Sequence, residues 1–124
     1  MARILVVEDE KDILELVEIS LQLGGLEVIK AEDGLEALEK ALTEKPDLIL
    51  LDIKMPGLSG YEVCRKLKEL PQTKNIPVVF LTARGQEHEI REGLEAGGDD
   101  YIVKPFAPDE LPRRVKEILS RFRK

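Results

Sequence analysis

Three acidic side chains, one threonine and one lysine stand directly after short apolar runs of this sequence. They are Glu8 and Asp9 after the first run, Asp52 after the third, Thr82 after the fourth and Lys104 after the fifth. If the runs are parallel strands of one sheet, their carboxyl ends share one edge, where ligand sites form. The five side chains then converge on that edge, and this convergence is the main functional signal of the sequence.

The chemistry that fits this group is phosphoryl transfer beside a divalent cation. Neighbouring carboxylates repel one another, and a hard cation with oxygen ligands relieves the repulsion. Few carboxylates with several waters suit Mg²⁺ better than Ca²⁺. The cation and Lys104 can share the charge of a phosphoryl group, which a carboxylate can accept as an acyl phosphate. Asp52, after the central run, is the candidate nucleophile.

The elements that must hold these residues are apolar runs and amphipathic stretches in alternation. Four of the five runs are almost continuously apolar, as in strands buried on both faces of a parallel sheet. Glu27 interrupts the second run, which indicates an edge strand. Strand and helix alternate five times, so we expect one doubly wound α/β domain over residues 1–124, with helices on both faces. The expected strands are residues 3–7, 26–29, 48–51, 78–81 and 101–103.

Each amphipathic stretch carries apolar residues at helical spacing, and we expect these residues to face the sheet. The five expected stripes are Ile13, Leu16, Val17 and Leu21; Leu35, Leu38, Ala41 and Leu42; Val63, Leu67 and Leu70; Ile90 and Leu94; and Val115, Ile118, Leu119 and Phe122.

Composition and charge exclude several other classes of protein. One cysteine and one histidine in 124 residues exclude a disulfide framework and a zinc cluster. The formal net charge of -6 argues against binding to nucleic-acid phosphates. An acid soon interrupts the first apolar run, so we expect no signal peptide, and no run is long enough to span a membrane. We therefore expect a soluble, cytoplasmic protein that binds neither nucleic acid nor membrane.

Six segments match a known family, in order and at the spacing of the strand ends. They are residues 6–9, 33–38, 51–57, 59–60, 81–83 and 98–106. On these segments the whole chain resembles a response-regulator receiver domain of two-component (phosphorelay) signalling, similar to the chemotaxis-type single-domain receivers. With the alternation above, the resemblance implies a flavodoxin-like (βα)5 fold whose five-stranded parallel sheet has the order 2-1-3-4-5.

The resemblance also implies a phospho-acceptor and a metal site. Asp52 would accept a phosphoryl group from a sensor histidine kinase or a phosphotransfer protein. Asp9 and Asp52 would hold Mg²⁺ directly, together with the backbone carbonyl of Lys54. Glu8 would act through a metal-bound water.

A switch is implied as well. Thr82 would bind one phosphoryl oxygen and Lys104 another, and Tyr101 would turn inward as Thr82 moves. The Lys104–Pro105 peptide bond would be cis. Phosphorylation would then shift a two-state population and change the surface of the fourth helix, fifth strand and fifth helix.

Other interpretations exist for single residues and for the whole site. Asp9 alone could be the N-cap of the first helix. A dehalogenase-like phosphatase also uses an aspartate nucleophile, but it has a second aspartate two residues later, where this chain has Lys54. A flavin carrier needs a phosphate loop after the first strand, where Glu8 and Asp9 would repel the phosphate. A receiver-like module that only binds partners would not need all five residues.

The sequence says less about enzyme activity, state of assembly and the downstream partner. The resemblance implies that Lys54 and Arg84 flank the route of the hydrolytic water, where their long side chains would crowd it. We therefore expect no enzyme activity beyond self-phosphorylation and slow self-dephosphorylation. We also expect a monomer, because Glu92 and Glu110 would place two acids where related transcription factors have an attractive pair across a dimer interface. The downstream partner is an unknown protein target or an effector domain missing from this chain.

Overall fold

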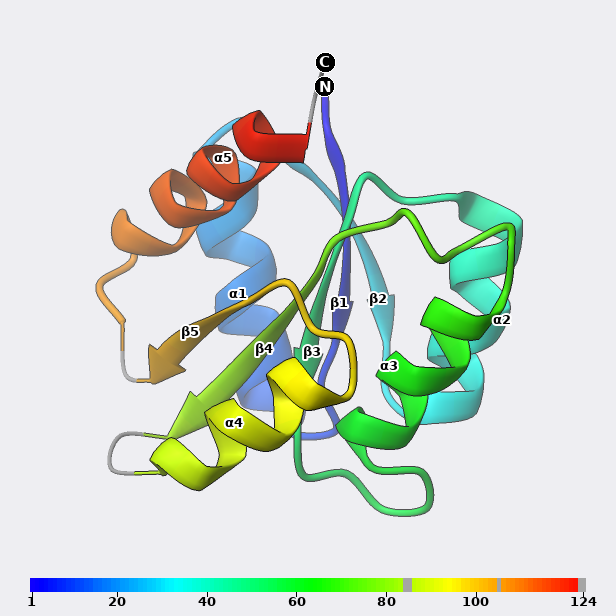
Figure 1. The fold of residues 1–124 in the computed structure, drawn as a ribbon. Coiled ribbons are helices and arrows are strands. Elements are labelled where there is room, and N and C mark those ends of the chain that lie inside the picture. The colour runs from blue at the N-terminus through cyan, green and yellow to red at the C-terminus, as the bar shows by residue number, and fades with distance from the viewer. Residues whose placement is uncertain (84–85, 105, 123–124) are drawn as a thin grey trace.

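The computed structural model describes residues 1–83, 86–104 and 106–122, in which strands and helices alternate (Figure 1). The strands are β1 (Arg3–Val7), β2 (Glu27–Ala31), β3 (Leu48–Asp52), β4 (Val78–Ala83) and β5 (Asp100–Lys104). The helices are α1 (Lys11–Leu23), α2 (Gly34–Glu44), α3 (Gly60–Glu69), α4 (Glu87–Glu95) and α5 (Glu110–Phe122). The strands form one parallel sheet in the order β2-β1-β3-β4-β5, which confirms the predicted doubly wound fold.

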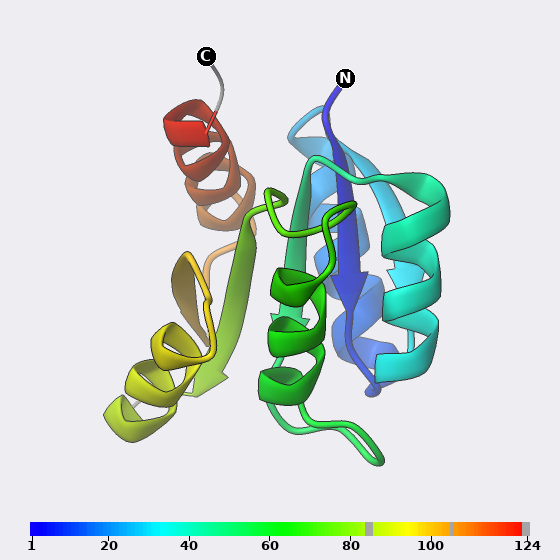
Figure 2. The ribbon, with the colours of Figure 1, turned by 45° about the vertical axis from the view of Figure 1, so that its right-hand side comes forward.

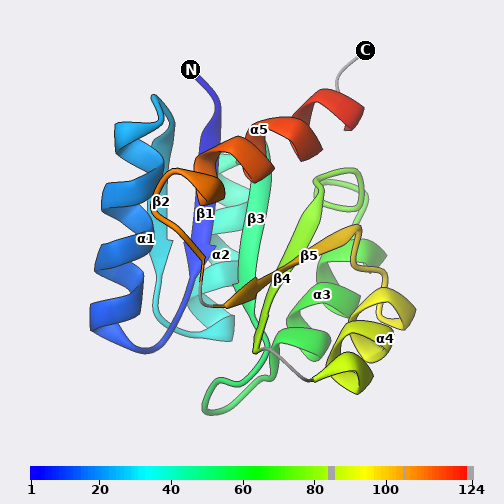
Figure 3. The same cartoon turned by 90° about the vertical axis from the view of Figure 1, so that its left-hand side faces the viewer.

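The helices cover both faces of this sheet. α1 and α5 lie on one face, and α2, α3 and α4 lie on the other (Figures 2 and 3). Successive side chains of a strand point to opposite faces. Ile4 and Val6 therefore pack with α1 and α5, whereas Leu5 and Val7 pack with α2 and α3. β3, in the middle of the sheet, is buried along its whole length, and the exposed Glu27 confirms that β2 is an edge strand.

The predicted apolar stripes of the helices are only partly correct. Four of their leucines are exposed: Leu16 by 53%, Leu35 by 72%, Leu42 by 38% and Leu94 by 47%. Leu14 completes the buried face of α1 instead, and Ala37 that of α2. Apolar residues occur on more than one face of these helices, so helical spacing alone admits two neighbouring stripes. A small residue such as Ala37 gives a weak signal in the sequence although it is completely buried.

Candidate functional site

The sheet brings the predicted carboxylates together at its carboxyl edge. β1 and β3 are neighbours, with Val7 opposite Leu51, so the residues that follow these positions lie side by side. Glu8, Asp9 and Asp52 each offer an oxygen atom, and these atoms all lie within 4.8 Å of one another. Glu8 and Asp52 are buried and Asp9 is half-buried. The three acids therefore form one cluster, as the sequence predicts.

Lys104 reaches this cluster from β5, the edge strand of the sheet on the side opposite β2. Its Nζ lies 3.4 Å from Oε1 of Glu8 and 3.4 Å from Oδ1 of Asp52. β4 lies between β5 and β3, so the long side chain crosses the end of β4 to reach Asp52. One ammonium thus stands among three carboxylates, and the excess of negative charge fits a divalent cation with oxygen ligands.

Burial and neighbouring charges shift the pKa values of Glu8, Asp52 and Lys104. Burial, and next the charge of Asp52, raise the pKa of Glu8 from 4.5 to about 7, although Lys104 opposes this shift. Burial also raises the pKa of Asp52 against the attraction of Lys104. For Lys104, burial lowers the pKa, but the charges of Asp52 and Glu8 outweigh it and the pKa is raised. A cation at this site would displace protons, because its ligands must be deprotonated.

The raised pKa of Glu8 predicts how the stability of the metal-free protein depends on pH. Between pH 4.5 and about 7 the folded protein keeps this proton while the unfolded chain releases it, so the free energy of unfolding falls as pH rises. At about 1.4 kcal/mol per unit of pKa, the fall reaches about 3 kcal/mol. The raised pKa of Asp52 acts in the same direction.

Urea unfolding in the presence of a chelator, at steps of pH across this window, measures the effect. The variant Glu8→Gln has no proton to release at this position, so we expect a flatter profile. A fall as steep in Glu8→Gln as in the wild type contradicts the assignment to Glu8.

Thr82, at the end of β4, contacts a residue that sequence reasoning missed. Its buried Oγ1 donates a hydrogen bond of 2.9 Å to Oε1 of Glu89, a buried acid near the start of α4. Oε2 of Glu89 lies 3.6 Å from Nζ of Lys54. An acid in the first turn of a helix is usually explained by the helix dipole, which draws attention away from Glu89. Glu89 lies four residues before Gly93 on the buried face of α4, but the burial of both residues is known only from the structure.

The loop that follows Asp52 is fixed where it enters α3. The N–H of Gly60 donates a hydrogen bond of 2.8 Å to the carbonyl oxygen of Ile53. Ser59 and Glu62 form a capping box at the start of α3, in which each side chain accepts from the other residue's backbone. This loop carries Lys54, whose side chain is 81% exposed.

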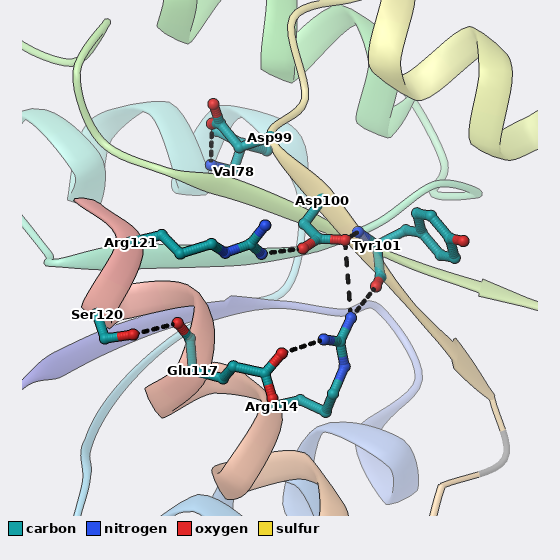
Figure 4. A network of polar contacts seen from close by, with 8 residues as sticks. All are labelled: Val78, Asp99, Asp100, Tyr101, Arg114, Glu117, Ser120 and Arg121. Carbon is teal, nitrogen blue, oxygen red and sulfur yellow. Dashed lines mark hydrogen bonds and ion pairs between the residues drawn. The ribbon is translucent and has the colours of Figure 1, made fainter.

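The remaining predicted residues lie away from the acidic cluster or need a correction. Tyr101 is 36% exposed, and its ring points away from the ion pairs of Asp100 (Figure 4). Its inward turn stays a prediction. α1 begins after Glu10, so the alternative that Asp9 is an N-cap is wrong. Arg84 and the Lys104–Pro105 peptide bond lie outside the described residues.

Comparison with protein families and curated proteins agrees with this arrangement. The model of the response regulator receiver domain matches residues 4–116. The alkaline phosphatase synthesis transcriptional regulatory protein PhoP of Bacillus subtilis is 50% identical over 119 residues, which cover 96% of this chain and 49% of PhoP. The phosphate regulon transcriptional regulatory protein PhoB of Escherichia coli is 49% identical over 120 residues, which cover 97% of this chain and 52% of PhoB. The chain thus spans about half the length of the curated relatives it matches.

Solved structures share the fold. The chemotaxis protein CheY4 of Vibrio cholerae matches with a TM-score of 0.89 and 35% identity, over 95% of this chain and 98% of CheY4. The receiver domain of the Francisella response regulator 1452 matches with a TM-score of 0.88 and 35% identity, over 99% of this chain and 100% of that domain. Within the described part of the chain, no helix is long and apolar enough to cross a bilayer. Fold, edge residues and sequence agree, and the chain belongs to the response regulator receiver domain family.

Proposed function

We propose that the chain is a phospho-acceptor switch in which Asp52 receives a phosphoryl group from a sensor histidine kinase or a phosphotransfer protein. The observation that carries this proposal is the cluster of three carboxylates with Nζ of Lys104 3.4 Å from Oδ1 of Asp52. Asp52 ends the central strand of the sheet and lies at the site where doubly wound folds bind ligands.

In the proposed reaction, a carboxylate oxygen of Asp52 forms a bond to phosphorus. The bond between phosphorus and the donor atom breaks, and its electron pair leaves with the donor, which is an imidazole of a kinase or the acetate of acetyl phosphate. The product is an acyl phosphate. Lys104 stabilises the charge on one phosphoryl oxygen, and the hydroxyl of Thr82 donates a hydrogen bond to another. The Tyr101 ring then turns inward as Thr82 moves.

The same cluster supports a Mg²⁺ site. Asp9 and Asp52 would hold the ion directly with the backbone carbonyl of Lys54, and Glu8 would contact it through a water. The position of Glu8 supports this assignment: burial, and next the charge of Asp52, raise its pKa although Lys104 opposes this shift, so a further cation would be favoured here. Bound Mg²⁺ would neutralise charge that develops on the phosphoryl oxygens.

A signalling role is favoured over that of a hydrolytic enzyme. A dehalogenase-like phosphatase would have a second aspartate two residues after the nucleophile, and Lys54 occupies that position. The Lys54 ammonium lies 3.6 Å from Oε2 of Glu89. We therefore propose no activity beyond self-phosphorylation and slow self-dephosphorylation.

Intact mass spectrometry tests the proposed function. With Mg²⁺ and acetyl phosphate, the wild type is expected to gain the mass of one phosphoryl group, and Asp52→Ala is expected to gain none. A chelator should prevent the gain in the wild type. Equal phosphorylation of wild type and Asp52→Ala contradicts the choice of acceptor.

We propose that the protein works in the cytoplasm and passes its signal through the face formed by α4, β5 and α5. The receiver of that signal would be a protein target or an effector domain outside this chain. Two curated relatives are named transcriptional regulators, and the chain spans about half of each. The net charge of -6 disfavours direct contact of this domain with nucleic acid or an anionic membrane.

The ion pairs on this face support the expectation of a monomer on other grounds than the sequence suggested. Glu92 is exposed and lines a cleft with Tyr61 of α3, and its repulsion of Glu110 across a dimer interface stays a prediction. Asp100 pairs with Arg114, at 3.7 Å, and with Arg121, and both arginines belong to the same chain as Asp100 (Figure 4). A dimer that used these charges would first have to break pairs that are already satisfied.

Light scattering in the presence of the phosphate mimic beryllofluoride and Mg²⁺ measures the state of assembly. We expect the mass of one chain at micromolar concentrations. A shift to the mass of two chains that Arg114→Ala abolishes contradicts this prediction.

A further inference from the structure

Glu89 connects two parts of the proposed site. Its Oε1 accepts the hydrogen bond from Oγ1 of Thr82 at 2.9 Å, and its Oε2 lies 3.6 Å from Nζ of Lys54. Its backbone carbonyl oxygen accepts a hydrogen bond of 3.1 Å from the Tyr61 hydroxyl, which ties α4 to α3. With both oxygens engaged and its side chain only 7% exposed, the carboxylate has a defined position between β4 and the loop after β3.

Glu89 and a phosphoryl group on Asp52 would compete for the hydroxyl proton of Thr82. A threonine hydroxyl has one proton to donate, and in this structure Thr82 donates it to Glu89. Asp52 lies opposite Leu81, the residue before Thr82, so the acceptor and the hydroxyl are on adjacent strands. A hydroxyl that turns to a phosphoryl oxygen leaves Glu89, and a buried acceptor that loses a donor opposes that turn.

We propose that Glu89 is a positioning residue that holds the Thr82 hydroxyl in its unphosphorylated position and so sets how readily the switch turns. This inference rests on the proposed phosphorylation of Asp52. Lys54 contributes by holding the second oxygen of Glu89, which leaves the first one directed at Thr82. Removal of the Glu89 carboxylate frees the hydroxyl for a phosphoryl oxygen.

A double-mutant cycle on beryllofluoride affinity, measured by calorimetry with Mg²⁺, tests the competition. We expect Glu89→Met to bind beryllofluoride about tenfold more tightly than the wild type, because a competing acceptor is gone. Glu89→Gln keeps an acceptor oxygen without the charge, so its affinity is expected to lie between the two. In a Thr82→Val background, which has no hydroxyl, Glu89→Met is expected to lose this effect.

Glu92→Gln is the matched control for charge. Glu92 lines the same cleft from the same helix, so its substitution measures the general effect of one less acid on an anionic ligand. The change caused by Glu89→Met in the Thr82→Val background should not exceed the change caused by Glu92→Gln.

A second measurement examines the unphosphorylated protein. The hydroxyl proton of Thr82 is buried and bonded to Glu89, so we expect NMR to show it protected from exchange with water. In Glu89→Met this protection should disappear. If Glu89→Met does not fold, Glu89→Gln takes its place in the double-mutant cycle, with a smaller tightening expected because its amide oxygen still accepts from Thr82.

The outcomes separate the two proposals. Equal tightening by Glu89→Met with and without the Thr82 hydroxyl, or an unprotected Thr82 hydroxyl in the wild type, overturns the role of Glu89 alone. A wild type that binds no beryllofluoride overturns the proposed function, and the role of Glu89 falls with it.

Discussion

Replacing Asp9 with alanine is expected to weaken Mg²⁺ binding by about 100-fold or more, since even indirect partners of a bound metal commonly contribute 10–100-fold. Asp9 is proposed as one of two direct carboxylate ligands, and its side chain does not cap α1, which begins after Glu10. The substitution therefore removes a ligand without removing a cap. Glu8→Gln should weaken binding less, because its contact is expected to run through a water.

Calorimetric titration of Mg²⁺ well above pH 7 measures this order, because Glu8, with a pKa raised to about 7, is then largely ionised in the metal-free protein. Glu10→Gln is the matched control: Glu10 is an exposed acid next to Asp9 and is not a member of the cluster. The affinity of Glu10→Gln for Mg²⁺ should stay close to that of the wild type. A larger loss in Glu8→Gln than in Asp9→Ala reverses the proposed ligand assignment.

Gly60→Ala is expected to destabilise the fold by about 3 kcal/mol, at the upper end of the usual cost of overpacking. A Cβ at Gly60 would lie 2.4 Å from the backbone oxygen of Asp52 and 2.9 Å from Cα of Ile53. Both obstacles are backbone atoms at the end of the central strand, so relief requires that strand or α3 to move. Because the acceptor sits on this backbone, phosphorylation of Asp52 should also slow.

Gly57→Ala in the same loop is the control for Gly60→Ala. Gly57 has a φ of +80°, and a Cβ there meets nothing within 4 Å, so its substitution carries backbone strain of about 1 kcal/mol without a clash. Urea unfolding of the two variants gives the difference. An equal loss of stability in both shows that the close approach at Gly60 is not the cause.

The acidic cluster and Lys104 could be predicted because their position depends on strand ends. Asp52 follows a run that is apolar at every residue, which marks a central strand, and the edge shared by parallel strands brings Glu8 and Asp9 beside it. No knowledge of side-chain packing is needed for this step. The resemblance to receiver domains then supplied the roles of Thr82 and Tyr101, which strand ends alone do not give.

Glu89 and the helix faces could not be predicted in the same way. Burial of Glu89 depends on how α4 rotates against the sheet, and Thr82 satisfies its carboxylate only once that rotation is set. Leu16 and Leu35 fit the helical spacing of a buried stripe, yet both are exposed because neighbouring positions fill the interface. Each of these cases depends on packing between elements distant in sequence.

The chemical identity of the phosphorylated side chain tests the proposed function most directly. Borohydride reduces an aspartyl phosphate to homoserine, which marks the acceptor permanently. After incubation of the wild type with Mg²⁺ and acetyl phosphate, followed by borohydride, peptide mapping by mass spectrometry should find homoserine at position 52 and unmodified acids at Glu8 and Asp9. Homoserine at another position, or a phosphate on a serine or threonine that survives borohydride, would contradict the role of Asp52.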